Sequence, residues 1–199
     1  MTRLTTGFMC WLMMNKSELR KIYKAKRRAL SDADFAAINE RLFSRFFDEL
    51  DATLTEIDYL HTYLPITRLR EVDTLAIIQM LKKRYSNVGL VLSRTDMAQG
   101  TMSNHLVVGQ MSLVENDWGI PEPQNTQPFD GILIDVVLVP LLVADKHGHR
   151  VGYGKGFYDR FLGQLRPDAL KVGLSLFPVI DHIDDTNEHD VPLDLIITP

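Results

Sequence analysis

The segment HRVGYGKGFYDRFL, at residues 149–162, places three glycines around a lysine and runs directly into a helix-like stretch. Gly152, Gly154 and Gly156 have no side chains to cover their amides, and each can adopt a positive φ. Successive N–H groups can therefore converge on an anion, while Lys155 adds a positive charge. Phosphate is the natural ligand of such a loop, because the N-terminus of the following helix points at the same place.

The loop differs from the two common nucleotide-binding motifs. No Ser or Thr follows the lysine, as a Walker A loop requires, and Phe157 stands where G-x-G-x-x-G has its third glycine. A glycine-rich turn between a strand and a helix can also be purely structural. Lys155 in the middle of the turn favours a functional role.

Asp159 lies on the first turn of the predicted helix, where its charge would repel a directly bound phosphate. A divalent cation between the two resolves the conflict, because Mg²⁺ binds a carboxylate together with phosphate oxygens. The alternative is that Asp159 only stabilises the helix N-terminus through the helix dipole. The residues alone leave both interpretations open.

A second basic element lies near the N-terminus, where the lysines and arginines are Lys16, Arg20, Lys21, Lys24, Lys26, Arg27 and Arg28. Lys16 and Arg20 share one face of a helix, and Arg27 continues that face two turns later. This face could bind a polyphosphate or a polyglutamate tail. A solvated helix surface and a weak nucleic-acid patch are the alternative interpretations.

Three other features contain residue types that can take part in chemistry or binding. The segment 181–194 is rich in carboxylates and holds two histidines, so it could bind metal or form an exposed loop. His147 and His149 flank Gly148 in a predicted turn, and we expect both at the surface. Trp118, in NDWGIPEP, is large enough to close over a flat ligand or over the core.

Composition limits the class of protein. A chain of 199 residues with 45% apolar and 24% charged residues is typical of one soluble globular domain. The net charge of −4 argues against non-specific nucleic-acid binding. The single cysteine excludes an internal disulfide and a cysteine-based zinc site, which fits the cytoplasm. The longest apolar stretch, residues 131–144, is too short to span a bilayer.

Helical signals dominate the first part of the chain. Asn15 with Glu18, and Ser31 with Asp34, predict the starts of two helices, and Asp73 predicts a third. One face of the second helix should be buried, because apolar residues recur on it at steps of three and four: Phe35, Ile38, Leu42, Phe46 and Leu50.

Later segments alternate between strand-like and helical patterns. The predicted strands lie within 57–64, 88–93, 105–109, 132–140, 171–177 and 193–198. This alternation, with a nearly all-apolar strand at 132–139, indicates an α/β fold, a layered sandwich with a central, largely parallel sheet flanked by helices. Ligands in such folds bind beyond the carboxyl ends of strands, and the glycine loop follows the most apolar strand.

Five segments together resemble the 5-formyltetrahydrofolate cyclo-ligase family, also called methenyltetrahydrofolate synthetase. They are KSELRKIYKAKRRALS, YLPITRLREVDT, NDWGIPEP, VPLLVADKHGHRVGYGKGFYDRFL and EHDVPLDLIIT. The resemblance implies an ATP- and Mg²⁺-dependent cyclisation of 5-formyltetrahydrofolate to 5,10-methenyltetrahydrofolate, with release of ADP and phosphate. It implies a phosphorylated formyl intermediate, in which the formyl oxygen has attacked the γ-phosphate.

The resemblance also implies site residues. Lys155 would be catalytic, and Asp159 and Asp190 would bind magnesium. ATP would contact Lys16, Ser17, Glu18, Leu19, Arg20, Arg150, Val151, Gly152, Tyr153, Gly154, Lys155, Gly156, Phe157 and Tyr158. The folate would contact Leu64, Glu71, Tyr153, Gly154, Lys155, Gly156 and Phe157. Tyr153 stands where some members have arginine, and Phe157 where many have tyrosine.

We therefore expect a cytoplasmic, monomeric enzyme that acts on a reduced folate, with or without a polyglutamate tail, and has no nucleic-acid or membrane partner. Residues 1–14 are expected to form a disordered leader, and 15–199 a single catalytic domain. Two other classes stay open. One is an ATP-dependent enzyme for another small molecule, and the other is a non-catalytic nucleotide- or RNA-binding module.

Overall fold

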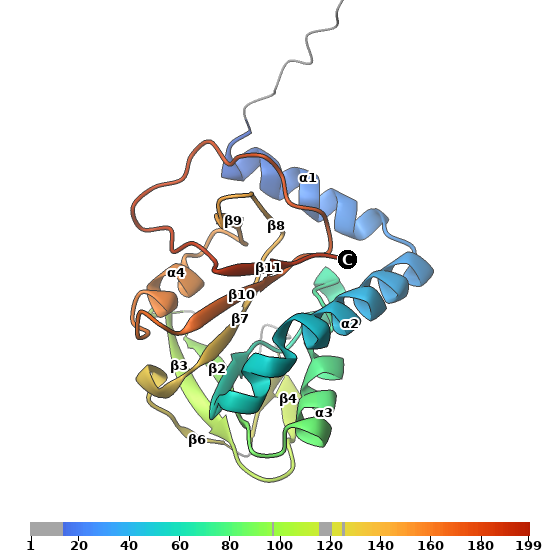
Figure 1. Cartoon of the computed structure of the whole chain (residues 1–199). Coiled ribbons are helices and arrows are strands. Elements are labelled where there is room, and N and C mark those ends of the chain that lie inside the picture. The colour runs from blue at the N-terminus through green and yellow to red at the C-terminus, as the bar shows by residue number, and fades with distance from the viewer. Residues whose placement is uncertain (1–13, 97, 116–120, 125) are drawn as a thin grey trace, which may run out of the picture.

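The computed structural model describes residues 14–96, 98–115, 121–124 and 126–199. They form a layered α/β structure around a seven-stranded sheet of order β11-β10-β7-β1-β2-β3-β6 (Figure 1). The strands of this sheet are β1 (Tyr59–Thr62), β2 (Gly89–Asp96), β3 (Thr101–Val107), β6 (Thr126–Pro128), β7 (Val136–Pro140), β10 (Leu170–Leu174) and β11 (Leu195–Ile197).

The sheet is largely parallel, as the alternation of helices and strands predicted. The neighbouring strands β11, β10, β7, β1 and β2 all pair in parallel, and only β3 and β6 join antiparallel. Two small antiparallel pairs lie beside it, β4 (Leu113–Glu115) with β5 (Pro121–Pro123), and β8 (Val143–Ala144) with β9 (Arg150–Val151). The β8–β9 hairpin follows the carboxyl end of β7 and leads directly into the glycine loop.

The predicted caps start the predicted helices. The helices are α1 (Lys16–Ala29), α2 (Asp32–Glu56), α3 (Thr74–Arg84) and α4 (Phe157–Leu162), with 3₁₀ turns η1 (Thr67–Leu69) and η2 (Gly131–Leu133). Asn15 and Glu18 form a reciprocal capping box on α1. The side chains of Ser31 and Asp73 accept backbone N–H groups at the starts of α2 and α3. Each such cap stabilises its helix by about 1 kcal/mol.

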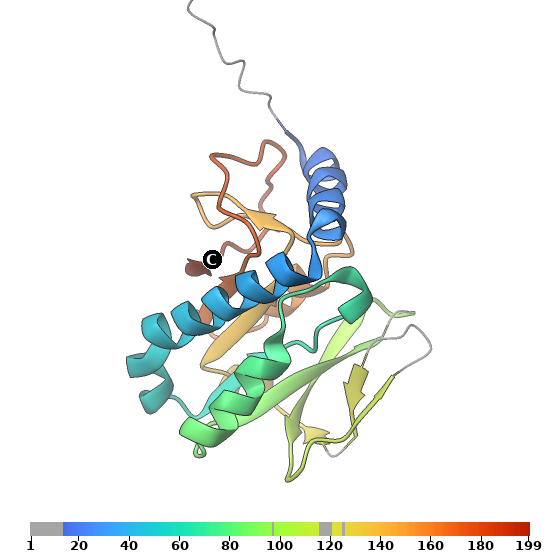
Figure 2. The same cartoon turned by 90° about the vertical axis from the view of Figure 1, so that its right-hand side faces the viewer.

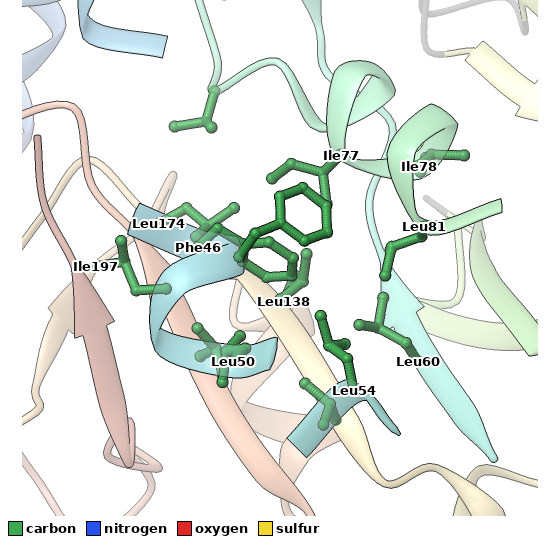
Figure 3. Packing of buried hydrophobic residues seen from close by; sticks show 14 of the residues in the cluster. Phe46, Leu50, Leu54, Leu60, Ile77, Ile78, Leu81, Leu138, Leu174 and Ile197 are labelled. Atoms are coloured by element: carbon green, nitrogen blue, oxygen red, sulfur yellow. The ribbon is translucent and has the colours of Figure 1, made fainter. Parts of the chain in front are cut away.

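The main core lies between the sheet and the pair α2 and α3 (Figure 3). Leu42, Phe46 and Leu50 are fully buried, and Phe35 and Ile38 pack partly buried at the edge, so the predicted apolar face is confirmed. Burying each of these large side chains contributes about 1.5–3 kcal/mol. On the opposite face of the sheet, α4 packs through its own buried residues, Phe161 and Leu162. The sheet is thus covered by helices on both faces.

The prediction of a strand at 132–139 is wrong for the first half of that segment. Residues 131–133 form η2 instead, because the Asp130 side chain accepts the Ile132 N–H at 3.1 Å and turns the chain. Ile132 and Leu133 are consequently exposed, at 55% and 52%. The strand begins only at Val136, where burial in the sheet is complete.

Two of the expectations concern residues that the structure does not describe. These are residues 1–13 of the expected leader and Trp118. Within the described ranges, no helix is both long and apolar enough to cross a membrane.

Candidate active site

A cavity of about 360 Å³ lies where the parallel strands end. Tyr63 and Leu64, just beyond β1, line it together with Pro140 at the end of β7. Ser93 and Thr95 line it from the carboxyl half of β2. The cavity therefore occupies the edge of the sheet that open α/β folds use for ligands.

The glycine loop forms one wall of this cavity, through Gly152, Gly154, Lys155 and Gly156. Gly154 and Gly156 have φ values of 89° and 67°, where other residues are strained. A Cβ atom on Gly154 would also come within 3.0 Å of the Arg20 guanidinium. Gly152 does not adopt the positive φ that its residue type allows, and the space beside it is open.

One face of α1 packs against the loop and the C-terminal segment, and Figure 2 shows this helix beside the β8–β9 hairpin. Lys16 Nζ pairs with Asp190 Oδ2 at 2.5 Å, and Arg20 Nε donates to Gly152 O at 2.9 Å. Arg27 is only 3% exposed. The solvated-face interpretation is therefore wrong for these three residues, although Lys21, Lys26 and Arg28 are exposed as it predicts.

The two proposed metal ligands lie on the same cavity wall. Asp159 Oδ1 pairs with Arg150 Nη2 at 2.5 Å, and Asp190 Oδ2 accepts the Asn187 N–H at 2.7 Å in addition to Lys16. Burial alone would raise the pKa of Asp190, but the hydrogen bonds from Lys16 and Asn187 outweigh it and lower that pKa. Both carboxylates are thereby held in place by positive groups.

These carboxylates fit a magnesium ion that accompanies a polyphosphate. Among the described residues, no group of three or more His, Cys, Asp or Glu side chains is arranged to hold a metal ion. Mg²⁺ bound with nucleotide phosphates needs only one or two carboxylates, because phosphate oxygens and water complete its shell. Asp159 and Asp190 supply that number from one wall.

Glu71 enters the cavity from the segment between η1 and α3 and is only 6% exposed. The Ile66 N–H donates to Glu71 Oε2 at 2.8 Å, and Arg70 takes a left-handed conformation, with φ of 49°, directly before it. Burial raises the pKa of Glu71, although the Ile66 hydrogen bond and the nearby Tyr153 and Arg27 oppose this rise. Leu64, 8% exposed, lines the cavity as well.

Four of the residues that the resemblance implied for ATP do not line the cavity. Leu19 and Val151 are completely buried and pack in one apolar cluster. Ser17 is exposed, and the Glu18 side chain is engaged in the capping box. All the other implied site residues line the cavity, namely Lys16, Arg20, Leu64, Glu71, Arg150, Gly152, Tyr153, Gly154, Lys155, Gly156, Phe157, Tyr158, Asp159 and Asp190.

The cavity has further lining residues that sequence reasoning missed, among them Tyr63, Ser93, Thr95 and Met102. Ser93 and Thr95 are two residues apart in β2, so they share a face of the sheet, and this spacing was a usable signal. Behind Ser93 lies His61, fully buried, with its Nε2 2.7 Å from Ser93 Oγ. Burial lowers the pKa of His61 to about 3, so its ring is neutral.

The expectation for the hairpin histidines holds for His147, which is exposed, but not for His149. His149 is half-buried, because its Nδ1 lies 3.2 Å from the buried carboxylate of Asp145. Asp145 also accepts the backbone N–H groups of His147, His149 and Ile183. Its role is to fix the hairpin that leads into the glycine loop.

Known proteins are similar to this chain in sequence. The Mycoplasma genitalium 5-formyltetrahydrofolate cyclo-ligase is 27% identical over 186 residues, covering 93% of this chain and 98% of the relative. The Escherichia coli protein of that name is 30% identical over 134 residues, covering 65% of this chain and 72% of the relative.

Two solved structures support the same relationship. The 5,10-methenyltetrahydrofolate synthetase of Mycoplasma pneumoniae matches with a TM-score of 0.73 at 27% identity, over 93% of this chain and 99% of that one. The Aquifex aeolicus 5,10-methenyltetrahydrofolate synthetase matches with a TM-score of 0.75 at 28% identity, over 92% and 89%. The sequence pattern of the 5-formyltetrahydrofolate cyclo-ligase family matches residues 12–199. The chain is therefore an enzyme of the ligase class and belongs to the 5-formyltetrahydrofolate cyclo-ligase family.

Proposed function

We propose that the protein catalyses the ATP- and Mg²⁺-dependent cyclisation of 5-formyltetrahydrofolate to 5,10-methenyltetrahydrofolate, with release of ADP and phosphate. The observation that carries this proposal is a single cavity with two chemically distinct walls. One wall holds the glycine loop, Lys155 and the two aspartates, and the other holds the buried carboxylate of Glu71. A polyphosphate suits the first wall and a heterocycle with N–H donors suits the second.

The reaction needs ATP because a formyl group attached to nitrogen is a poor electrophile. Its oxygen attacks the γ-phosphorus of ATP, so an O–P bond forms while the bond to the bridging oxygen breaks and ADP leaves. N10 of the folate then attacks the activated formyl carbon. A C–N bond forms, the C–O bond breaks, phosphate departs, and N10 loses its proton to water.

Lys155 would assist the phosphoryl transfer, and its exposure and its place in the cavity lining support this role. Its ammonium group would neutralise charge that develops on the transferring phosphoryl group and on the formyl oxygen. Lys16, Arg20 and Arg150, which line the same wall, would bind the rest of the triphosphate. Little covalent work falls to the protein, so alignment should supply most of the acceleration.

Asp159 and Asp190 would hold the magnesium ion, which neutralises phosphate charge and orients the triphosphate when bound. Arg150 and Lys16 each pair with one oxygen of these carboxylates. These pairings would reduce the repulsion between the two aspartates, both of which line the cavity.

The folate would lie toward Glu71 and Leu64, where the ionised carboxylate accepts hydrogen bonds from the pterin ring. Met102 and Phe157 supply apolar surface to the same cavity. We further propose that the substrate can carry a polyglutamate tail. We also propose that residues 15–199 act as one monomeric catalytic domain in the cytoplasm, without a nucleic-acid or membrane partner, behind a disordered leader at 1–14.

The direct test is the near-ultraviolet absorbance of the purified protein with 5-formyltetrahydrofolate, ATP and Mg²⁺, because the methenyl product has a conjugated chromophore that the substrate lacks. We expect absorbance to rise only when all three are present, and ADP to form in equal amount. No rise, from folded protein that binds ATP in a titration, would reject the folate assignment and leave another ATP-dependent reaction.

A further inference from the structure

Arg27 is the most buried cation of α1, and it lies behind the cavity rather than in its lining. Its Nη2 donates to the Leu141 carbonyl, which anchors the side chain at the start of the β8–β9 hairpin. Its Nη1 donates to the Tyr153 hydroxyl oxygen at 3.0 Å. A buried guanidinium so placed is costly unless its charge is balanced nearby.

The Tyr153 hydroxyl connects this cation to a carboxylate. It interacts on its other side with Glu71, and this contact lowers the pKa of Glu71. Burial raises the pKa of Tyr153, and the Glu71 charge adds to the rise, so the hydroxyl keeps its proton. The oxygen therefore accepts from Arg27 while its proton is donated to Glu71, and the three side chains form a directed chain.

The tyrosines and the backbone N–H group that face Glu71 carry no charge, so the negative charge of Glu71 is compensated by Arg27. Tyr63, beyond β1, and Tyr158, on α4, both have pKa values raised by burial and further by Glu71, so both are neutral. From the η1 segment, the Ile66 N–H contacts the other carboxylate oxygen. Arg27, on α1, is the cation whose charge lowers the pKa of Glu71.

We propose that Arg27 and Tyr153 are positioning residues for the folate, which together hold Glu71 ionised and aimed into the cavity. This inference rests on the proposed function, because it assumes that Glu71 receives the pterin ring. A carboxylate this deeply buried tends to take up a proton and lose its ability to accept two hydrogen bonds. The chain from Arg27 opposes that tendency without placing a cation in the cavity itself.

The test compares Tyr153→Phe and Arg27→Met with two matched controls, Tyr23→Phe and Arg28→Met. Tyr153→Phe removes one hydroxyl and keeps the ring, so it is the variant least disturbing to the fold. Tyr23 lies on α1 and does not line the cavity, and Arg28 is the exposed neighbour of Arg27. Melting temperatures of all four variants identify any that unfolds. If Arg27→Met unfolds, Tyr153→Phe alone tests whether the Arg27–Tyr153–Glu71 chain positions the folate.

The expected result is a rise of about tenfold in KM for 5-formyltetrahydrofolate in Tyr153→Phe at neutral pH, from loss of a hydrogen bond to a charged group. KM for ATP and kcat should change by less than about twofold. Acidification should raise KM for the folate from a higher pH in both site variants than in the wild type, because Glu71 then protonates more readily. The controls should match the wild type.

Three results would overturn the inference. They are an unchanged KM for the folate, a rise confined to KM for ATP, and a rise in KM with an unshifted pH profile, as a purely structural role would cause. The wild-type assay run beside the variants separates the two claims. An inactive wild type rejects the proposed function, whereas an active wild type with an unaffected Tyr153→Phe rejects only the positioning chain.

Discussion

The two walls of the cavity differ in the number of charged side chains that line them and in how deeply their residues are buried. The loop wall, defined by Lys16, Arg20, Lys155, Asp159 and Asp190, is lined by charged side chains. Lys16 pairs with Asp190 and Asp159 pairs with Arg150, whereas Lys155 is exposed. The sheet wall, defined by Tyr63, Leu64, Glu71 and Ser93, is backed by fully buried groups.

The difference shows in the titrating groups. On the sheet wall, burial raises the pKa values of Tyr63 and Glu71 and lowers that of His61, behind Ser93. On the loop wall, hydrogen bonds from positive and backbone groups lower the pKa of Asp190 despite its partial burial. A wall of charged side chains in ion pairs suits a polyphosphate and its cation, whereas a more deeply buried wall suits a flat ring recognised by a few hydrogen bonds.

The largest expected effect is on the loop wall, where Lys155→Ala should lower kcat by about a thousandfold. The physical reason is the loss of positive charge where the transferring phosphoryl group develops negative charge. Turnover measured by methenyl absorbance at saturating substrates gives kcat, and the melting temperature should be unchanged. Lys146→Ala, at an exposed lysine of the hairpin, is the matched control. Normal turnover in Lys155→Ala would contradict the two-wall assignment.

A second loop-wall change should act on magnesium. Asp159→Asn and Asp190→Asn should each raise the Mg²⁺ concentration needed for half-maximal activity by about tenfold or more, because each removes an anionic ligand. Activity measured across a Mg²⁺ titration shows this, with KM for the folate little changed. Asp168→Asn, at an exposed carboxylate, is the control. If all three variants needed the same Mg²⁺ concentration, the assignment of Asp159 and Asp190 as magnesium ligands would be rejected.

A sheet-wall change should act on the folate instead. Glu71→Gln should raise KM for 5-formyltetrahydrofolate by about tenfold at neutral pH and leave the Mg²⁺ requirement unaltered. Since the pKa of Glu71 is raised above its ordinary value, the wild-type KM should increase as the pH falls and the carboxylate protonates. The Gln variant cannot titrate, so its KM should stay nearly constant over that range. A pH-dependent KM in Glu71→Gln would assign the titration to another group.

The smallest expected effect concerns stability rather than activity and tests how dry the sheet wall is. The pKa of His61 is about 3 in the folded protein and about 6.5 when unfolded, so below pH 6.5 the unfolded chain binds one more proton. The free energy of unfolding should therefore fall by about 1 kcal/mol per pH unit between pH 6 and 4. Urea unfolding of wild type and His61→Phe measures it, and equal slopes would show that His61 is hydrated.

The sequence predicted most of the fold because its signals are local. Caps at Asn15, Ser31 and Asp73 and the apolar period of α2 depend on residues a few positions apart. One exception, residues 131–133, also has a local cause, since Asp130 caps a 3₁₀ turn that the apolar pattern hides. For the site, the resemblance named the glycine loop, Leu64 and Glu71, all of which line the cavity.

Other parts of the site depend on contacts between distant segments. The pairing of Lys16 with Asp190 joins residues 174 positions apart, and that of Arg27 with Tyr153 joins residues 126 apart. A basic helix face looks the same in sequence whether it is solvated or packed on a loop. In the folded protein α1 packs against the β8–β9 hairpin, and this packing shows that part of its basic face is buried and not solvated.

By itself, the sequence determined the layered parallel fold, the glycine loop with its lysine, and the family, because these depend on local pattern and on motif. Only the tertiary structure decided which cations of α1 face the cavity, that Ser93 and Thr95 line it, and that Glu71 lies beside Tyr153. The physical reason is that charge and protonation depend on burial and on neighbours brought together by folding, and no short stretch of the chain contains that information.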